Sequence, residues 1–261
     1  VLFIISFSKL VNFPLSQDHP IRIHLINIAK VAIPLKNLIL MRNVDDKIAL
    51  LKSSGSCVFC DLTQGNFKGN DLKGVDLRYA ILIGADLRWA YFEGVNLRTA
   101  NLTGADLRYT WLSETDLRNS NLSNADMDNA QFSGIDLSGA TLRNAYASNA
   151  NFSGAIFDGA NLSQVDFSDT NLSKADLRES YMYKAVFIRS NLTDATLANA
   201  QMREVNLQGA LLLGANLRSA NLSGANLTDA DLSTADLSSA NMEGTIFCNT
   251  LTPWGEDNSG C

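Results

Sequence analysis

The chain has 261 residues, a formal net charge of −6 at neutral pH, and a hydrophobic content of 46%. This length allows one large domain or two with a sizeable core, and the sequence has no run of about 20 apolar residues of the kind that a membrane span needs. Within residues 60–249, acidic residues exceed lysine and arginine by eight, and an acidic body argues against nucleic acid as a partner.

Residues 1–40 form an N-terminal segment whose role the sequence leaves open. Its first eight residues, VLFIISFS, suit the apolar core of a targeting signal but lack a basic leader and a clear cleavage site. The first methionine is Met41. Three alternatives are therefore open: the sequence is a fragment, translation starts at a codon other than Met, or the sequence carries upstream residues that the natural product lacks. Both histidines, His19 and His24, lie here at a spacing of five rather than the four of a helical metal site, and we expect no metal there.

Residues 41–59 are expected to form a capping helix and a loop. In NVDDKIALLKSSG (43–55), Asn43 is a good N-cap residue and Gly55 a good terminator. Ile48 and Leu51 are the apolar residues that we expect to cover the element that follows.

Residues 60–249 repeat with a period of five. The 190 residues divide into thirty-eight pentads without an insertion, and the centre of each pentad is Leu in twenty-five, Phe in eight, Met in four and Ala in one. Two residues before the centre the side chain is small, and Asn or Asp often stands between the two. Two residues after the centre, Gly, Asn or Asp fills twenty-three of the thirty-eight positions.

This period matches neither a helix, which needs apolar residues about every 3.6 positions, nor a strand, which needs them every second position. Because Gly, Asn and Asp tolerate positive φ, each pentad can end in a tight turn. Four such turns close a square, and the small and large side chains of each pentad then point inward.

The A(D/N)LXX pattern resembles the pentapeptide repeat proteins over residues 60–249. The resemblance implies an all-β fold, a right-handed quadrilateral β-helix of about nine to ten coils with four pentads per coil. At a coil spacing of ~4.8 Å this gives a rod of roughly 45 Å. The expected core centres include Leu62, Phe67, Leu87, Leu107, Ala147, Phe152, Phe157, Phe167, Leu217 and Phe247.

Ala147 breaks the pattern because it removes a large core group. Phe152 and Phe157 follow it in the same coil, and Phe167 lies one coil further along the same face. We expect these rings to compensate for the missing volume, because protein cores resist voids.

Residues 250–261 are expected to form a C-terminal cap, with Leu251 and Trp254 as a lid over the last coil. The segments SSGSCVFCDL (53–62) and FCNTLTPWGEDNSGC (247–261) resemble cyanobacterial members of the family in particular.

All four cysteines flank the repeat, at Cys57, Cys60, Cys248 and Cys261. A single zinc site is excluded if the implied fold is correct, because the two pairs then lie at opposite ends of the rod. Disulfides 57–60 and 248–261 suit end caps and would indicate an oxidising compartment, the periplasm or thylakoid lumen. Reduced thiols, a redox-active Cys57-x-x-Cys60 and a cytoplasmic location are the alternatives.

Catalytic and cofactor motifs are missing from the sequence. Neither GxxxxGK[ST] nor GxSxG occurs, and the frequent carboxylates alternate with amides at one repeat position, as in Asp86, Asn96 and Asp106. A catalytic carboxylate rarely becomes an amide, so these side chains are expected to bond turn backbone. We therefore expect no enzyme activity, no metal and no cofactor.

One surface carries the residue types favoured at protein interfaces. Arg88 and Arg108 share one face and precede Trp89 and Tyr109, whereas Tyr91 and Trp111 are expected to stack on a third face. The alternative is a solvated wall in which stacking only stabilises the rod. Scattered outward apolar pairs, such as those at 81 and 83, leave a homo-oligomer open.

The function favoured by these observations is a non-enzymatic scaffold that binds an unidentified protein partner through its flat faces. Some members of the family regulate cyanobacterial differentiation and others reside in the thylakoid lumen. One alternative is the DNA mimicry of the gyrase-protecting relatives, but a ~45 Å duplex carries ~26 charges, against the net −8 of residues 60–249. Another alternative is a structural protein of the periplasm or thylakoid lumen without a discrete ligand.

Overall fold

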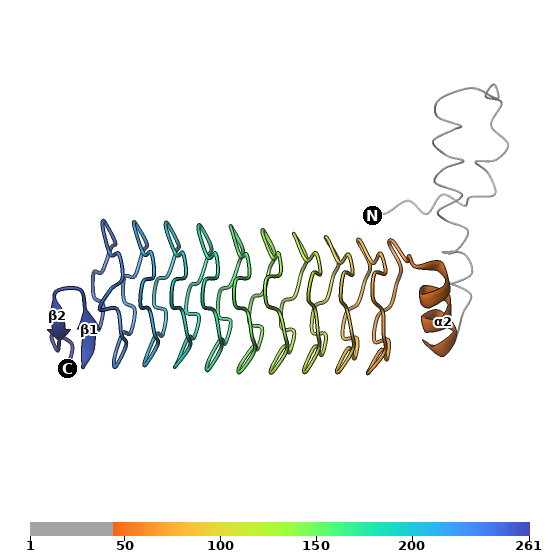
Figure 1. Cartoon of the computed structure of the whole chain (residues 1–261), viewed down its shortest axis with the longest axis horizontal. Helices are drawn as coiled ribbons and strands as arrows, with labels where there is room; N and C mark the ends of the chain where they lie inside the picture. The colour runs from red at the N-terminus through yellow and green to blue at the C-terminus, as the bar shows by residue number, and fades with distance from the viewer. Residues whose placement is uncertain (1–43) are drawn as a thin grey trace, which may run out of the picture. The chain divides into compact units, whose positions relative to one another are not determined.

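The computed structural model describes residues 44–261, and of helix α2 (Val44–Ser54) it describes the side chains only in part. The segment 1–40, with His19 and His24, lies outside the described residues. At the other end, strands β1 (Thr250–Thr252) and β2 (Gly255–Asp257) form an antiparallel hairpin (Figure 1). Among residues 44–261 no helix has both the length and the apolar character that crossing a membrane requires.

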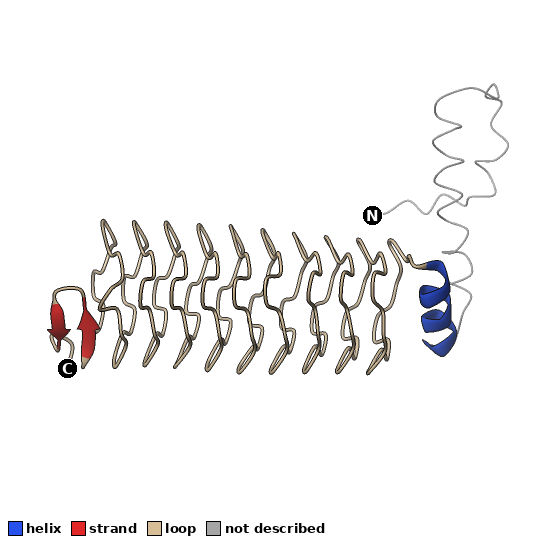
Figure 2. Ribbon diagram, viewed as in Figure 1, coloured by secondary structure: helices blue, strands red, loops and turns tan. Residues whose placement is uncertain are grey.

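Between α2 and β1 the chain winds into stacked coils, drawn as turns and loops in Figure 2. The residue before each pentad centre forms a parallel bridge with the residue twenty positions later, from Ser56↔Asp76 to Asp231↔Leu251. The backbone follows the same interval: Leu87 N–H donates to Asp106 O at 2.8 Å, and Asp106 N–H donates to Ala85 O at 2.9 Å. One coil therefore contains four pentads, and residues twenty apart lie one above the other.

The corners between pentads use left-handed backbone. The residue two positions after the centre has positive φ in nearly every pentad, for example +62° at Gly84 and +57° at Asn124. Gly and Asn adopt this conformation readily, which explains why the sequence places them there. Positive φ also occurs at bulky corner residues, where it is uncommon.

The pentad centres fill the interior. Leu87, Leu107 and Leu217 have no exposed surface, whereas Phe247, near the C-terminal end, retains 8%. Ala147 is also fully buried. In its coil and the next, ring centroids lie 5.4 Å apart for Phe152–Phe157 and for Phe152–Phe167, and 5.9 Å apart for Phe157–Phe167. This cluster of large rings lies where the sequence loses a large side chain.

The N-terminal end is covered by the helix. Ile48 and Leu51 of α2 are 8% and 1% exposed. Gly55 then ends the helix: its φ is +66°, and its N–H donates to Leu51 O at 2.9 Å.

The prediction that Leu251 and Trp254 form a lid over the last coil is wrong. Leu251 and Trp254 are 44% and 57% exposed, while Thr250 and Thr252 are buried instead. Leu251 occupies the position one residue before a centre, and this position points outward throughout the repeat. Leu251 also forms a bridge with Asp231 of the preceding coil. Trp254 lies in the turn between β1 and β2.

Candidate functional site

The corner positions that hold aromatic residues form stacks between neighbouring coils. Trp89 and Tyr109 have φ of +61° and +60°, and their rings lie 4.3 Å apart at an interplanar angle of 6°. At another corner, Phe59 and Tyr79 combine positive φ with a 4.7 Å stack in the same way. Stacking thus offsets part of the cost of left-handed backbone at bulky residues.

A second stack lies beside the first, just past the same corner. Tyr91 and Trp111, each one residue before a centre, have ring centroids 4.9 Å apart at an angle of 8°. Trp89 contacts Trp111 diagonally at 6.2 Å. We name these four residues, Trp89, Tyr91, Tyr109 and Trp111, the aromatic corner. The structure thus brings together all four aromatic residues that the sequence singled out.

The two arginines of the predicted surface belong to a line of alternating charges next to the corner. Arg88 Nη2 lies 2.7 Å from Asp86 Oδ2, and Arg88 Nε lies 3.4 Å from Asp106 Oδ2 in the next coil. Arg108 repeats the arrangement, at 2.6 Å from Asp106 and 3.3 Å from Asp126. We name these five residues the ion-pair ladder.

The ladder holds its arginines in fixed positions. The hydrogen bond from Arg88 holds the pKa of Asp86 below its usual range, and the hydrogen bond to Asp106 raises the pKa of Arg108. Each arginine is therefore largely neutralised by carboxylates within the wall, which leaves little free positive charge for a phosphate or another anion.

Both the aromatic corner and the ladder end at the same coil. The residues that follow Tyr109 and Trp111 by twenty positions are Asn129 and Gln131, and the residue that follows Arg108 is Asp128. A cavity of about 320 Å³ lies where the aromatic stacks end. It is lined by Trp89, Tyr109, Trp111, Ser113, Asn129, Gln131 and Ser133. Burial raises the pKa of Asp128, and the neighbouring charge of Asp126 raises it further, against the hydrogen bond from Ser148 N–H.

The five-residue pattern alone does not single out Asp128 or the end of the two stacks. The signal was available: Asp-x-Arg occurs at 86–88 and 106–108, and Asp-x-Asp replaces it at 126–128. It becomes visible only when residues twenty apart are compared, because these are the residues that the coil places side by side.

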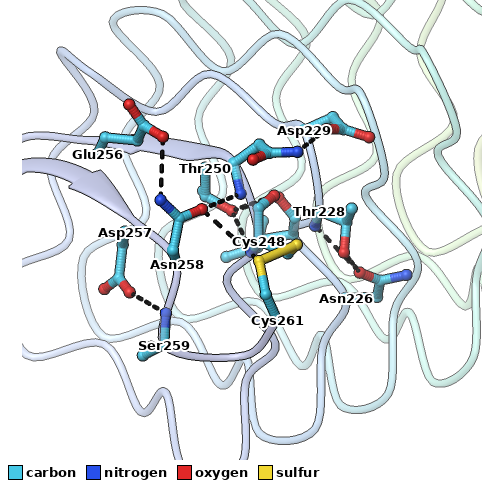
Figure 3. The surroundings of a disulfide bond; sticks show 12 residues. Asn226, Thr228, Asp229, Cys248, Thr250, Glu256, Asp257, Asn258, Ser259 and Cys261 are labelled. Carbon is cyan, nitrogen blue, oxygen red and sulfur yellow. Dashed lines mark hydrogen bonds between the residues drawn. A yellow bond between two sulfur atoms is a disulfide. The ribbon is translucent and has the colours of Figure 1, made fainter.

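The four cysteines form two disulfides, Cys57–Cys60 and Cys248–Cys261, with Cα–Cα distances of 5.5 and 4.9 Å. The second fastens the chain end to the last coil (Figure 3). Beside it, Asn249 N–H donates to Asn258 Oδ1 at 2.7 Å, and Gly260 N–H donates to Phe247 O at 2.7 Å. Leu237 and Met242 of the last coil stay half-buried, so this tail covers only part of the end.

The carboxylates and amides before the centres bond turn backbone. Asp86 Oδ1 accepts from Arg88 N–H at 3.2 Å, and Asn96 Oδ1 accepts from Arg98 N–H at 3.1 Å. Asp and Asn thus accept the same backbone hydrogen bond, which explains why they exchange at this position in the sequence. Within residues 44–261 no group of three His, Cys, Asp or Glu residues is arranged to hold a metal ion.

Comparisons with known proteins agree with this architecture. The model of the family described as pentapeptide repeats matches residues 56–94, 100–139, 135–173, 170–209 and 215–251. No curated protein matches the chain.

Among solved structures, QnrB1, a plasmid-mediated fluoroquinolone resistance protein, is 19% identical, with 72% of this chain and 89% of that chain covered and a TM-score of 0.59. HetL, involved in heterocyst differentiation regulation in the cyanobacterium Nostoc sp. strain PCC 7120, is 29% identical, with coverage of 80% and 96% and a TM-score of 0.48. A protein of the Arabidopsis thaliana thylakoid lumen is 32% identical, with coverage of 46% and 70% and a TM-score of 0.18. The likeness to QnrB1 reflects a shared fold, and the family model spans most of residues 56–251, so this chain belongs to the pentapeptide repeat family.

Proposed function

We propose that the chain is a non-enzymatic scaffold that binds a protein partner at the aromatic corner and the adjoining ion-pair ladder. The observation that carries the proposal is the exposure of the corner: Trp89, Tyr91 and Tyr109 are 44%, 43% and 38% exposed although they stack in ordered pairs. Side chains already held in one geometry lose little entropy on binding, and aromatic residues dominate the energetics of protein interfaces.

The ladder supports a protein partner over a DNA-mimic role. Its arginines interrupt the acidic residues of the same wall, since Arg88 and Arg108 alternate with Asp86, Asp106 and Asp126. A duplex presents an unbroken row of negative charges instead. We therefore propose no nucleic-acid-like surface here.

The experiment is a binding assay with a matched control. The immobilised chain is exposed to an extract of the organism that encodes it, and the retained protein is purified and titrated back by biolayer interferometry. Trp89→Ala and Trp111→Ala are expected to weaken saturable binding at least tenfold, as truncation of a hot-spot residue does. Tyr181→Ala, a 55% exposed tyrosine outside the corner, is expected to leave it unchanged. Equal binding by all three variants would refute the corner as the interface.

For the fold, we propose a right-handed β-helix of about nine to ten coils over residues 60–249, capped by residues 41–59 and 250–261. The twenty-residue interval of the bridges and the burial of Ile48 and Leu51 support it. A crystal structure would test the coil count and the handedness directly.

For location, we propose an oxidising compartment, the periplasm or thylakoid lumen. The two disulfides support this, because cytosolic thiols are usually kept reduced. Thiol titration of protein isolated from its native cells, with alkylation at lysis, is expected to find no reactive cysteine. Four reactive thiols would place the chain in a reducing compartment.

A further inference from the structure

The ion-pair ladder ends one arginine short. Arg88 and Arg108 each pair with the aspartate of their own coil and with that of the next coil. In the third coil, Asp126 receives Arg108 from one side only, and the position twenty residues after Arg108 is Asp128. Two carboxylates therefore stand where the two preceding coils have a carboxylate and a guanidinium.

The aromatic corner ends at the same place. The cavity of about 320 Å³ begins where Tyr109 and Trp111 give way to Asn129 and Gln131. In the preceding coil the space beside Trp89 and Tyr91 holds the second ring of each stack, at 4.3 and 4.9 Å. At the consecutive residues 128 and 129 the chain thus lacks the positive charge and the ring that residues 108 and 109 supply, and Asn129, though not Asp128, lines the cavity.

We propose that this cavity, the arginine step, receives an arginine side chain of the protein partner. The inference rests on the proposed function and names the chemistry of the contact. A guanidinium is both planar and cationic, stacks on aromatic faces and pairs with carboxylates through two N–H groups. It would continue both the aromatic stack and the ion-pair ladder by one member.

The polar groups near the step leave acceptors free for such a side chain. Asp128 Oδ1 accepts from Ser148 N–H at 2.7 Å, while its Oδ2 has no partner among the described residues. Gln131 Oε1 is already engaged by Asn151 Nδ2 at 3.3 Å, whereas the side-chain oxygen of Asn129 has no partner within residues 44–261. We expect Asp128 and Asn129 to accept the guanidinium hydrogen bonds.

Other occupants match only part of the step. A lysine supplies the charge without a plane, and an aromatic or proline ring supplies the plane without the charge. A phosphate or carboxylate would face Asp126 and Asp128 without a free cation. Arginine is the residue that satisfies both missing functions.

The first test uses three peptides, Gly-Ser-Gly-X-Gly-Ser-Gly, with X as arginine, lysine or citrulline. Citrulline keeps the planar shape of arginine but carries no charge, so it isolates the electrostatic part. Binding is followed by NMR through the indole N–H signals of the protein's three tryptophans, with Trp254, at the far C-terminal end, as an internal reference. The arginine peptide is expected to shift the signals of Trp89 and Trp111 and to leave Trp254 unmoved.

We expect the arginine peptide to bind about tenfold more tightly than the citrulline peptide, and also more tightly than the lysine peptide. Equal affinity of arginine and citrulline would overturn the proposal in favour of a neutral ring. Equal affinity of arginine and lysine would overturn it in favour of a simple charge. No shift of Trp111 with the arginine peptide would show that the step does not take the side chain.

The second test uses variants of one position. Asp128→Asn keeps the acceptor for Ser148 N–H and removes the charge, and we expect about threefold weaker binding of the arginine peptide. Asp128→Arg places a guanidinium from the chain itself at the step and is expected to abolish binding while the protein remains folded. Glu243→Gln, a change of charge in the last coil, is the matched control and is expected to have no effect. Unchanged binding by Asp128→Arg would contradict the proposal.

The two proposals can fail separately. If a protein partner is lost with Trp111→Ala but retained with Asp128→Arg, the proposed function stands and the arginine step is wrong. If the arginine peptide binds as expected and no protein partner depends on the corner, the step stands and the proposed function is wrong.

Discussion

The interior and the outer wall of the same coils follow different rules. In the segment Leu211–Leu213, Leu212 has no exposed surface, whereas Leu211, one residue earlier, is 45% exposed. Interior positions repeat almost without exception, but wall positions change from coil to coil, and one stretch of wall carries the aromatic corner. Core packing and the proposed partner binding therefore depend on residues that alternate along one chain, and we expect that each can be altered while the other is kept.

The largest expected effect separates interior from wall with a single residue type. Leu212→Ala is expected to reduce the free energy of unfolding by about 2–5 kcal/mol, because it leaves a cavity in a closed core. Leu211→Ala is expected to change it by less than about 0.5 kcal/mol. Urea denaturation measures both. Similar losses for the two variants would mean that the wall contributes to the core.

The next effect concerns the ends, where the interior meets solvent. Cys248→Ser opens a disulfide that spans 13 positions, and loop entropy predicts a loss of about 3 kcal/mol. Cys57→Ser opens one that spans 3 positions, for which the same relation predicts about 1.5 kcal/mol. Hydrogen exchange is expected to show the loss in residues 247–261 first. Equal destabilisation by both variants would contradict the loop-entropy account.

A smaller effect tests the strain in the wall itself. Both Trp89→Ala and Trp89→Gly remove the stack with Tyr109. The alanine variant keeps a Cβ atom at positive φ, whereas the glycine variant has none. The glycine variant is expected to be more stable than the alanine variant by about 1 kcal/mol. Both are expected to lose partner binding, since neither retains the indole. Equal stability of the two variants would show that the corner stores no backbone strain.

The smallest effect is that of one wall carboxylate. The pKa of Asp128 is raised in the folded protein, so ionisation opposes folding, and this cost appears as pH rises through its folded-state pKa. Asp128→Asn removes the cost and is expected to stabilise the protein at pH 7 by less than about 1 kcal/mol. This gain in stability is expected to vanish below the ordinary aspartate pKa of about 4, because Asp128 is then neutral in both the folded and the unfolded protein. Thermal unfolding at several pH values measures the difference, and a gain that grows on acidification would be the wrong sign.

The sequence was sufficient for the repeat and its interior. Because the chain turns after every fifth residue, burial of Leu87, Leu107 and Leu217 follows from position alone. The small corner residues follow from the positive φ of the corners. The interchange of Asp and Asn follows because both accept a hydrogen bond from the backbone N–H two residues later. These features are local, and a local pattern is enough to specify them.

The ends and the step required the tertiary structure. Leu251 and Trp254 looked like a lid because apolar residues usually cover an exposed core, but the outward direction of the Leu251 position overrides its hydrophobicity. Asp128 stands out only when it is compared with Arg108 and Tyr109, which are twenty and nineteen residues earlier and lie in the preceding coil. The sequence by itself determined how each pentad turns and which side chains it buries. Only the stacking of the coils decided which outward side chains become neighbours, because that depends on contacts made twenty residues apart.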